Sequence, residues 1–206
     1  MYALVTDGTI TKYFSYPKGF TLGDLQYPKD IFMKWSVEEK EAIGIYEVVF
    51  DDSNKKDEKW YINTNQSFAF ADGVVTASYG TAFPKAHADS LWTQADLDAG
   101  DLPDDKLVGD VKVEGLKTTL IRTLKQQVAG ILANTDWYIT RNAEKSTAIP
   151  SAISTHRDAV RTKQASIEAQ ITGATDTAAL ETLHTYTEDA EGVQSRPLGE
   201  LPVLES

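Results

Sequence analysis

Apolar side chains recur at the spacing of one helix face between residues 116 and 139, and this stripe limits the possible folds more than any other feature. The stripe comprises Leu116, Leu120, Leu124, Val128, Ile131, Leu132, Thr135 and Ile139. The spacing predicts one helix over about residues 115–144, roughly 45 Å long at 1.5 Å per residue. A single helix of that length leaves its apolar face in water, so we expect another helix or another chain to cover it.

A second helix is predicted to begin near Pro150, because proline is tolerated at the first helical position, and to end near residue 171. Its apolar residues at seven-residue spacing are Ile153, Val160 and Ile167. Arg157 and Gln164 occupy the alternate heptad positions, so the coiled-coil character is weak. With a short helix over residues 175–184, these segments form a predicted long helical hairpin over residues 111–186. A partner helix of mixed polarity leaves part of the first stripe uncovered, which predicts a homo-oligomer or a multi-copy assembly.

Two Asp-Gly dipeptides predict β-hairpins near the N-terminus, because both residues tolerate the positive φ angles of a two-residue turn. Asp7-Gly8 joins residues 2–6 to residues 9–14, and Asp72-Gly73 joins residues 66–71 to residues 74–82. Counting outward from the first turn places Val5 opposite Ile10 and Tyr2 opposite Tyr13. Alternation in the second hairpin places these residues on one face: Phe68, Phe70, Val75, Ala77 and Tyr79. This apolar face predicts a small sheet that packs on a helix or on another chain.

Ser36 and Glu39 have the spacing of a capping box, and Gly44 can end the short helix that they predict over residues 35–44. A strand is expected over residues 45–50, whereas the turn residues in 16–28 predict a loop. The fold class is therefore α+β, with a small antiparallel β-sheet module over residues 1–83. Residues 84–110 are predicted to be an acidic linker, and residues 187–206 an extended tail after the helical hairpin.

The charge balance disfavours nucleic acid as a partner. The chain of 206 residues has 31 acidic and 20 basic side chains, for a net charge of −11. Binding to a phosphate backbone requires clustered Lys and Arg. We expect no membrane segment or secretion signal, because no run of roughly 18 apolar residues and no basic, apolar leader is present.

The sequence contains none of the common catalytic patterns, and we expect no catalytic residues, no cofactor and no metal. It lacks Cys, and His87, His156 and His184 are not spaced as zinc ligands. The acidic run 96–101 resembles a calcium loop, but its Gly is at the fifth position and position twelve holds no Glu, so an acidic linker is favoured. A pair of unmarked carboxylates for glycoside cleavage remains an open alternative to the non-enzymatic interpretation.

Trp137, Tyr138 and Arg141 are the strongest candidates for recognition. Trp137 and Arg141 are four residues apart, so the guanidinium can lie over the indole in a helix. One interpretation is that this cluster attaches the first long helix to the second, where His156 and Arg157 are candidate contacts. The other is that it anchors a partner protein, because Trp, Tyr and Arg dominate interface hot spots.

The residues Asp136-Trp137-Tyr138-x-x-Arg141, the following Ile149-Pro150 and the helix that contains His156-Arg157 resemble the C-terminal helical hairpin of bacteriophage tail proteins. Residues 35–50 resemble the start of small tail proteins. The resemblance implies a non-enzymatic structural or adaptor protein of the virion tail, made in the host cytoplasm, in the baseplate or tail-fibre attachment region. Its implied partners are other tail, baseplate or fibre proteins. The alternative role is that of a tail-fibre assembly chaperone that is not retained in the virion.

Overall fold

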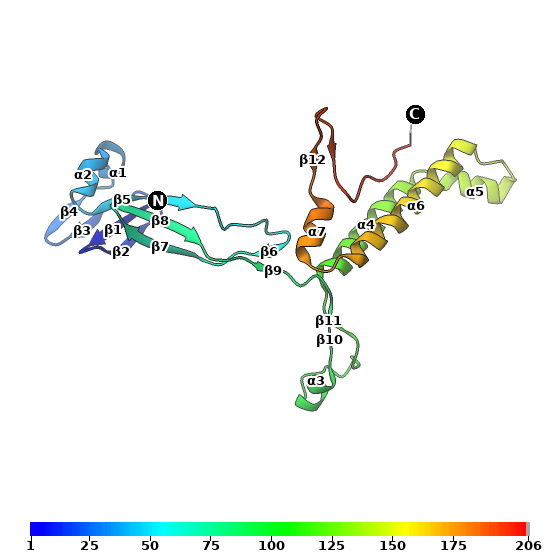
Figure 1. The fold of residues 1–206 in the computed structure, drawn as a ribbon, viewed down its shortest axis with the longest axis horizontal. Helices are drawn as coiled ribbons and strands as arrows, with labels where there is room; N and C mark the ends of the chain where they lie inside the picture. The colour runs from blue at the N-terminus through cyan, green and yellow to red at the C-terminus, as the bar shows by residue number, and fades with distance from the viewer. Residues whose placement is uncertain (205–206) are drawn as a thin grey trace. The chain divides into compact units, whose positions relative to one another are not determined.

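The computed structural model of the chain describes residues 1–204 and shows an α+β fold (Figure 1). Two compact units divide the chain after Phe83. The first unit is a curled sheet with two short helices, and the second contains a helical hairpin, as the sequence predicts. Among the helices of the described residues, none combines the length and the apolar character that a bilayer crossing requires.

The sheet of the first unit has five strands in the order β2-β1-β5-β8-β7. The elements of this unit are β1 (Tyr2–Thr6), β2 (Thr9–Phe14), β3 (Phe20–Leu22), β4 (Leu25–Tyr27), α1 (Ile31–Lys34), α2 (Val37–Glu41), β5 (Ile45–Asp51), β6 (Tyr61–Ile62), β7 (Gln66–Ala71), β8 (Val74–Tyr79) and β9 (Phe83–Pro84). The sheet is not wholly antiparallel as predicted, because β5 and β8 run parallel. The β7–β8 hairpin joins the sheet through β8, a pairing between segments distant in sequence that no local pattern indicates.

Both Asp-Gly turns form as predicted. Asp7 and Gly8 have φ angles of 51° and 74°, and Asp72 and Gly73 have 51° and 78°. Val5 lies opposite Ile10, but Tyr2 lies opposite Phe14 and not opposite Tyr13. A bulge between Leu4 and Val5 shifts the register by one residue of β2, so the predicted pairing of Tyr2 is wrong.

Apolar clusters cover both faces of the sheet. One buries Ala3, Val5, Val48, Val75 and Ala77. Phe68 and Phe70 pack against this cluster from β7, on the face that alternation predicted. The other cluster buries Leu4, Phe14, Phe20, Ile31, Phe32 and Ile45. The second cluster explains why residues 16–28 form the β3–β4 hairpin and not the predicted loop, since Phe20 of β3 is buried in it.

The short helix α2 has the predicted capping box. The Ser36 hydroxyl accepts a hydrogen bond from the Glu39 backbone N–H at 3.2 Å, and the Glu39 carboxylate accepts one from the Ser36 N–H at 2.8 Å. Gly44 follows the helix with a φ of 78°. A Cβ at this position would lie 2.4 Å from the Val5 carbonyl oxygen, so both the conformation and the space require glycine here.

The second unit is built on two packed helices, α4 and α6. Its elements are β10 (Ser90–Leu91), α3 (Gln94–Ala99), β11 (Val111–Val113), α4 (Leu116–Ala133), α5 (Asp136–Lys145), α6 (Ser151–Gly173), α7 (Thr177–His184), β12 (Thr187–Glu188) and β13 (Gln194–Ser195). Leu124 and Val128 of α4 are buried, as are Val160 and Ile167 of α6. The predicted single helix over residues 115–144 is wrong, because the chain leaves helical geometry at Thr135 and continues as α5.

Residues 86–114, termed the arm below, are folded where the sequence suggested a linker. Strands β10 and β11 pair with each other. Helix α3 lies between them in the sequence and begins with a Thr93–Asp96 capping box. Lys112 pairs with Asp96 at 2.5 Å and lies over the Trp92 ring, 4.4 Å from its centroid. The predicted extended tail also contains a short hairpin, β12–β13. Residues 205 and 206 of that tail prediction lie outside the described residues.

Candidate partner-binding surface

The break between α4 and α5 is made at Thr135, which is 3% exposed. Its φ and ψ angles are −120° and 5°, outside the helical range. The Thr135 hydroxyl donates to the Leu132 carbonyl oxygen at 3.0 Å, and the Thr135 N–H donates to the same oxygen at 3.0 Å. This local bonding satisfies the end of α4 and allows α5 to start in a new direction.

Arg157 of α6 holds this break from the opposite helix. Its Nη1 donates to the Leu132 carbonyl oxygen at 2.8 Å and to the Thr135 hydroxyl at 2.7 Å. The same nitrogen lies 2.9 Å from the Asp136 carboxylate, at the first residue of α5. The Arg157 side chain is 9% exposed and that of Asp136 is 60% exposed, so the guanidinium is buried against a carboxylate that faces water. Arg157, which the sequence predicts as a contact of the hairpin, therefore joins the start of α5 to α6.

Trp137, Tyr138 and Arg141 come together on α5. The Trp137 and Tyr138 ring centroids are 3.8 Å apart, and the Arg141 guanidinium lies 4.7 Å from the Trp137 centroid and 5.6 Å from that of Tyr138. Trp137 is 51% exposed, and no residue of α5 is buried. A half-exposed indole does not fit a buried packing contact between the two long helices, whereas it fits a surface that binds another molecule.

His156 is buried on α6 and lines a different feature. It borders a groove of about 450 Å³ together with Ser151, Ala152, Thr155 and Ala159 of α6 and Pro202, Val203 and Leu204 of the C-terminal segment. The residues that sequence reasoning missed are Thr135 and Asp136, which bond to Arg157. The spacing places Thr135 in the apolar stripe, and no local signal shows that Arg157 reaches it from α6.

Two acidic residues of the arm, Asp96 and Asp89, have partners within the same unit. Asp96 bonds to Lys112, to the Thr93 hydroxyl and to the Thr93 N–H, and these contacts lower the pKa of its carboxyl to about 2. Asp89 accepts hydrogen bonds from the Gly115 N–H and the Thr118 hydroxyl, and they lower its pKa as well. Within residues 1–204, no three carboxylate or imidazole groups gather in a way that could hold a metal ion.

A half-exposed indole stacked with a tyrosine ring and a guanidinium is suited to binding a protein, because such side chains bury large areas with little loss of conformational entropy. The geometry of α5 provides this arrangement on a helix with no buried residue. Comparison with protein-family models, with curated proteins and with solved structures finds no match to the chain.

Proposed function

We propose that this chain is a non-enzymatic structural or adaptor protein of a bacteriophage tail, in the baseplate or the tail-fibre attachment region. It acts through contacts with other tail proteins and is present in several copies. The proposal is supported by the resemblance of residues 136–141 and the following Ile-Pro and Arg-containing helix to the helical hairpin of tail proteins. Its setting is the virion tail, after synthesis in the host cytoplasm.

One structural observation carries the proposed mode of action, the exposure of Trp137 on α5. The indole is 51% exposed, and the Arg141 guanidinium and the Tyr138 ring both lie against it. An exposed aromatic side chain restrained by such contacts binds a partner with a smaller loss of rotamer entropy. We therefore assign Trp137 as the centre of the surface that contacts another tail protein, with Tyr138 and Arg141 as its supports.

Mass spectrometry of purified virions tests whether this chain is a component of the particle. A tail component is recovered from intact particles at a fixed ratio to other tail proteins. A tail-fibre assembly chaperone, which the same resemblance allows, is present in infected cells and absent from purified particles. Absence from particles would therefore overturn the structural role and leave the chaperone role.

The role of Trp137 is tested by Trp137→Ala. We expect loss of incorporation into particles together with a stability loss of about 1 kcal/mol or less, because the Trp137 indole is half-exposed and buries little area within its own chain. Tyr186→Ala is the matched control, since Tyr186 is 48% exposed and lies 5.0 Å from the Arg196 guanidinium. Normal incorporation of Trp137→Ala would show that this cluster is not the partner contact.

The non-enzymatic assignment is tested by peptidoglycan turnover with the purified chain. No turnover is expected, because Asp96 is already bound to Lys112 and Thr93, and its low pKa deprives it of the proton that a general acid must hold. If a preparation shows turnover, five acidic residues are replaced with Asn one at a time: Asp96, Asp98, Asp101, Asp104 and Asp105. Turnover that one of these replacements abolishes would overturn the assignment.

A further inference from the structure

The arm exposes apolar side chains that its own fold does not cover. No residue from 84 to 114 is buried. Leu107 is 73% exposed, and Leu97 and Val108 are each 47% exposed. A two-stranded pairing such as β10–β11 is only marginally stable alone in water. A surface that covers these apolar residues would therefore stabilise the arm.

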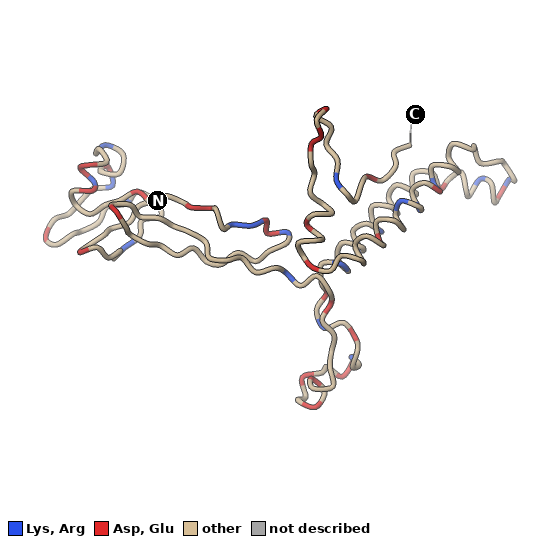
Figure 2. The backbone as a smooth tube through the Cα atoms, in the orientation of Figure 1, with Lys and Arg blue, Asp and Glu red and all other residues tan. Residues whose placement is uncertain are grey.

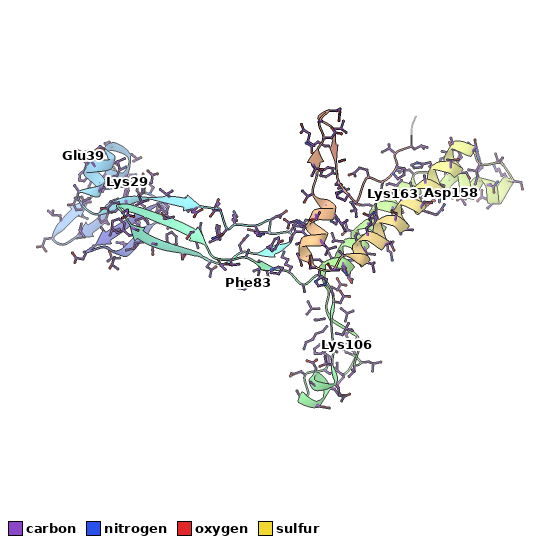
Figure 3. The ribbon with its side chains drawn as sticks, in the orientation of Figure 1. Lys29, Glu39, Phe83, Lys106, Asp158 and Lys163 are labelled. Carbon is purple, nitrogen blue, oxygen red and sulfur yellow. The ribbon has the colours of Figure 1, made fainter. Side chains whose placement is uncertain are left out.

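The end of the arm is also acidic. Asp98, Asp101, Asp104 and Asp105 lie on or after α3, and Figure 2 shows acidic residues gathered there. Lys106, labelled in Figure 3, is paired with Asp105 at 3.7 Å. The arm tip, residues 97–108, thus combines exposed Leu and Val side chains with carboxylates. It fits a surface that is apolar at its centre and basic at its margin.

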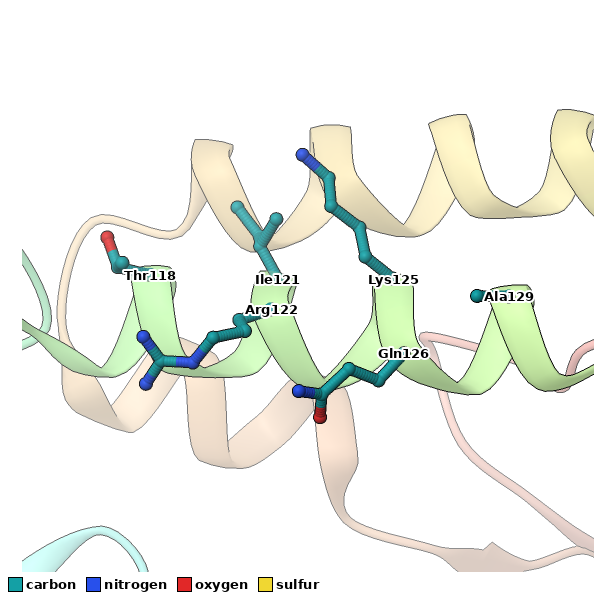
Figure 4. A pocket seen from close by; sticks show the side chains of 6 residues that line it. All are labelled: Thr118, Ile121, Arg122, Lys125, Gln126 and Ala129. Atoms are coloured by element: carbon teal, nitrogen blue, oxygen red, sulfur yellow. The ribbon is translucent and has the colours of Figure 1, made fainter.

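Helix α4 carries a surface of this kind. A groove of about 490 Å³ runs along it and is lined by Thr118, Ile121, Arg122, Lys125, Gln126 and Ala129 (Figure 4). Ile121 and Ala129 supply the apolar part, while Arg122 and Lys125 supply positive charge. Glu114, at the base of the arm, already pairs with Arg122 at 2.7 Å, so a carboxylate of the arm contacts this groove within one copy.

The base of the arm is fixed to the start of α4. Ala86 and His87 carbonyl oxygens accept hydrogen bonds from the N–H groups of Leu116 and Lys117, at 2.9 and 3.0 Å. From this base the arm extends away from α4 and α6, as Figure 1 shows. Within the second unit, the tip of the arm therefore lies apart from the groove of the same copy.

We propose that the arm tip of one copy docks in the α4 groove of a second copy. Leu107 and Val108 then cover Ile121 and Ala129, and the carboxylates at the tip approach Arg122 and Lys125. A net charge of −11 on each copy opposes general association, so the contact depends on these local basic groups. The two surfaces differ, so the contact either closes as a two-fold dimer with reciprocal arms or runs head-to-tail into a ring or an open chain of copies. The inference rests on the proposed function only for its setting, a tail protein present in several copies.

The test is sedimentation velocity of the full chain and of two variants, Leu107→Asp in the arm and Ala129→Glu in the groove. The wild-type chain is expected to self-associate, and each variant to do so at least about tenfold more weakly, as for loss of a central contact. An equal mixture of the two variants should form a heterodimer that does not grow, because one variant keeps an intact groove and the other an intact arm. This recovery also shows that both variants are folded.

The control variants are Val203→Asp, at a position that is 84% exposed, and Thr123→Glu, an exposed position of α4 outside the groove. Both should associate like the wild type. A wild-type chain that stays monomeric overturns the inference, as does unchanged association of Ala129→Glu or a mixture that forms no heterodimer. A monomeric chain that is still found in purified virions would reject the docking and leave the proposed function standing. An associating chain that is absent from virions would support the docking and reject the proposed function.

Discussion

Arg157→Met removes the guanidinium that holds the start of α5 while retaining an unbranched side chain about as long as the arginine stem. The Arg157 Nη1 donates to the Leu132 carbonyl oxygen and to the Thr135 hydroxyl, at 2.8 and 2.7 Å. Both acceptors belong to the break between α4 and α5. We expect the variant to lose stability and α5 to separate from the rest of the unit more often.

The magnitude follows from three contributions. Two hydrogen bonds from a charged donor contribute about 1.5–3 kcal/mol each. The ion pair with Asp136 adds about 0–1 kcal/mol, because that carboxylate is 60% exposed. The Arg157 Nε is buried without a hydrogen-bond partner among the described residues, and relief of this cost returns roughly 1–3 kcal/mol in the Met variant. The contributions span about 0–6 kcal/mol and centre on a net loss of about 3 kcal/mol.

The assay is urea denaturation followed by ellipticity at the helix band, together with amide hydrogen exchange of α5. Arg161→Met is the matched control, because the Arg161 side chain is 51% exposed on the same helix and its ion pair with Asp158 spans 3.4 Å. The control should lose less than about 0.5 kcal/mol. A loss below about 1 kcal/mol in Arg157→Met, or equal losses in both variants, would refute the assignment of Arg157 to the break.

Gly44→Ala should lower the stability of the first unit by about 2–4 kcal/mol in thermal denaturation, because Ala is strained at a φ of 78° and its Cβ would lie 2.4 Å from the Val5 carbonyl oxygen. Gly8→Ala, at a φ of 74° with nothing within 4 Å of the new Cβ, should lose only about 1 kcal/mol, and equal losses would contradict the steric argument. The Asp96 pKa of about 2 lies below the usual value near 3.9 of an unfolded chain, so its contribution to arm stability is present above about pH 4 and is lost as pH falls through about 2. Carbon NMR titration of the Asp96 carboxyl measures this pKa; Lys112→Ala should raise it, and an unchanged value would show that Lys112 is not the main cause.

The first unit could be predicted where its structure depends on neighbouring residues. Asp7-Gly8 and Asp72-Gly73 determine their turns through φ, and Ser36 with Glu39 determines the start of α2. The parallel pairing of β5 with β8 depends on contacts between distant segments, and the bulge at Leu4 and Val5 depends on how β1 fits between two neighbours. Neither is encoded in the alternation of apolar residues along a single strand.

In the second unit, the helical stripe predicted α4 and its packing but not the arm. The Thr93–Asp96 capping box and Gly100 at a φ of 78° delimit α3. Both signals lie within a run of aspartates whose composition suggested a linker. The contact of Lys112 with Asp96 and Trp92 then stabilises the arm from a position sixteen residues later. Local capping residues are therefore better evidence than composition in this segment.

The break at Thr135 changes what α5 exposes, and it connects the buried Arg157 to the proposed partner contact. In one continuous helix, Ile139 would extend the stripe of Leu124 and Val128 and be covered by α6. After the break Ile139 is 41% exposed and Trp137 is 51% exposed, about 200° apart around α5. Because no residue of α5 is buried, its attachment depends on the bonds at its first turn, where Arg157 meets Asp136. Arg157→Met should therefore reduce incorporation into particles although Arg157 itself faces no partner. Normal incorporation of a variant with the expected stability loss would show that the partner does not require α5 in this position.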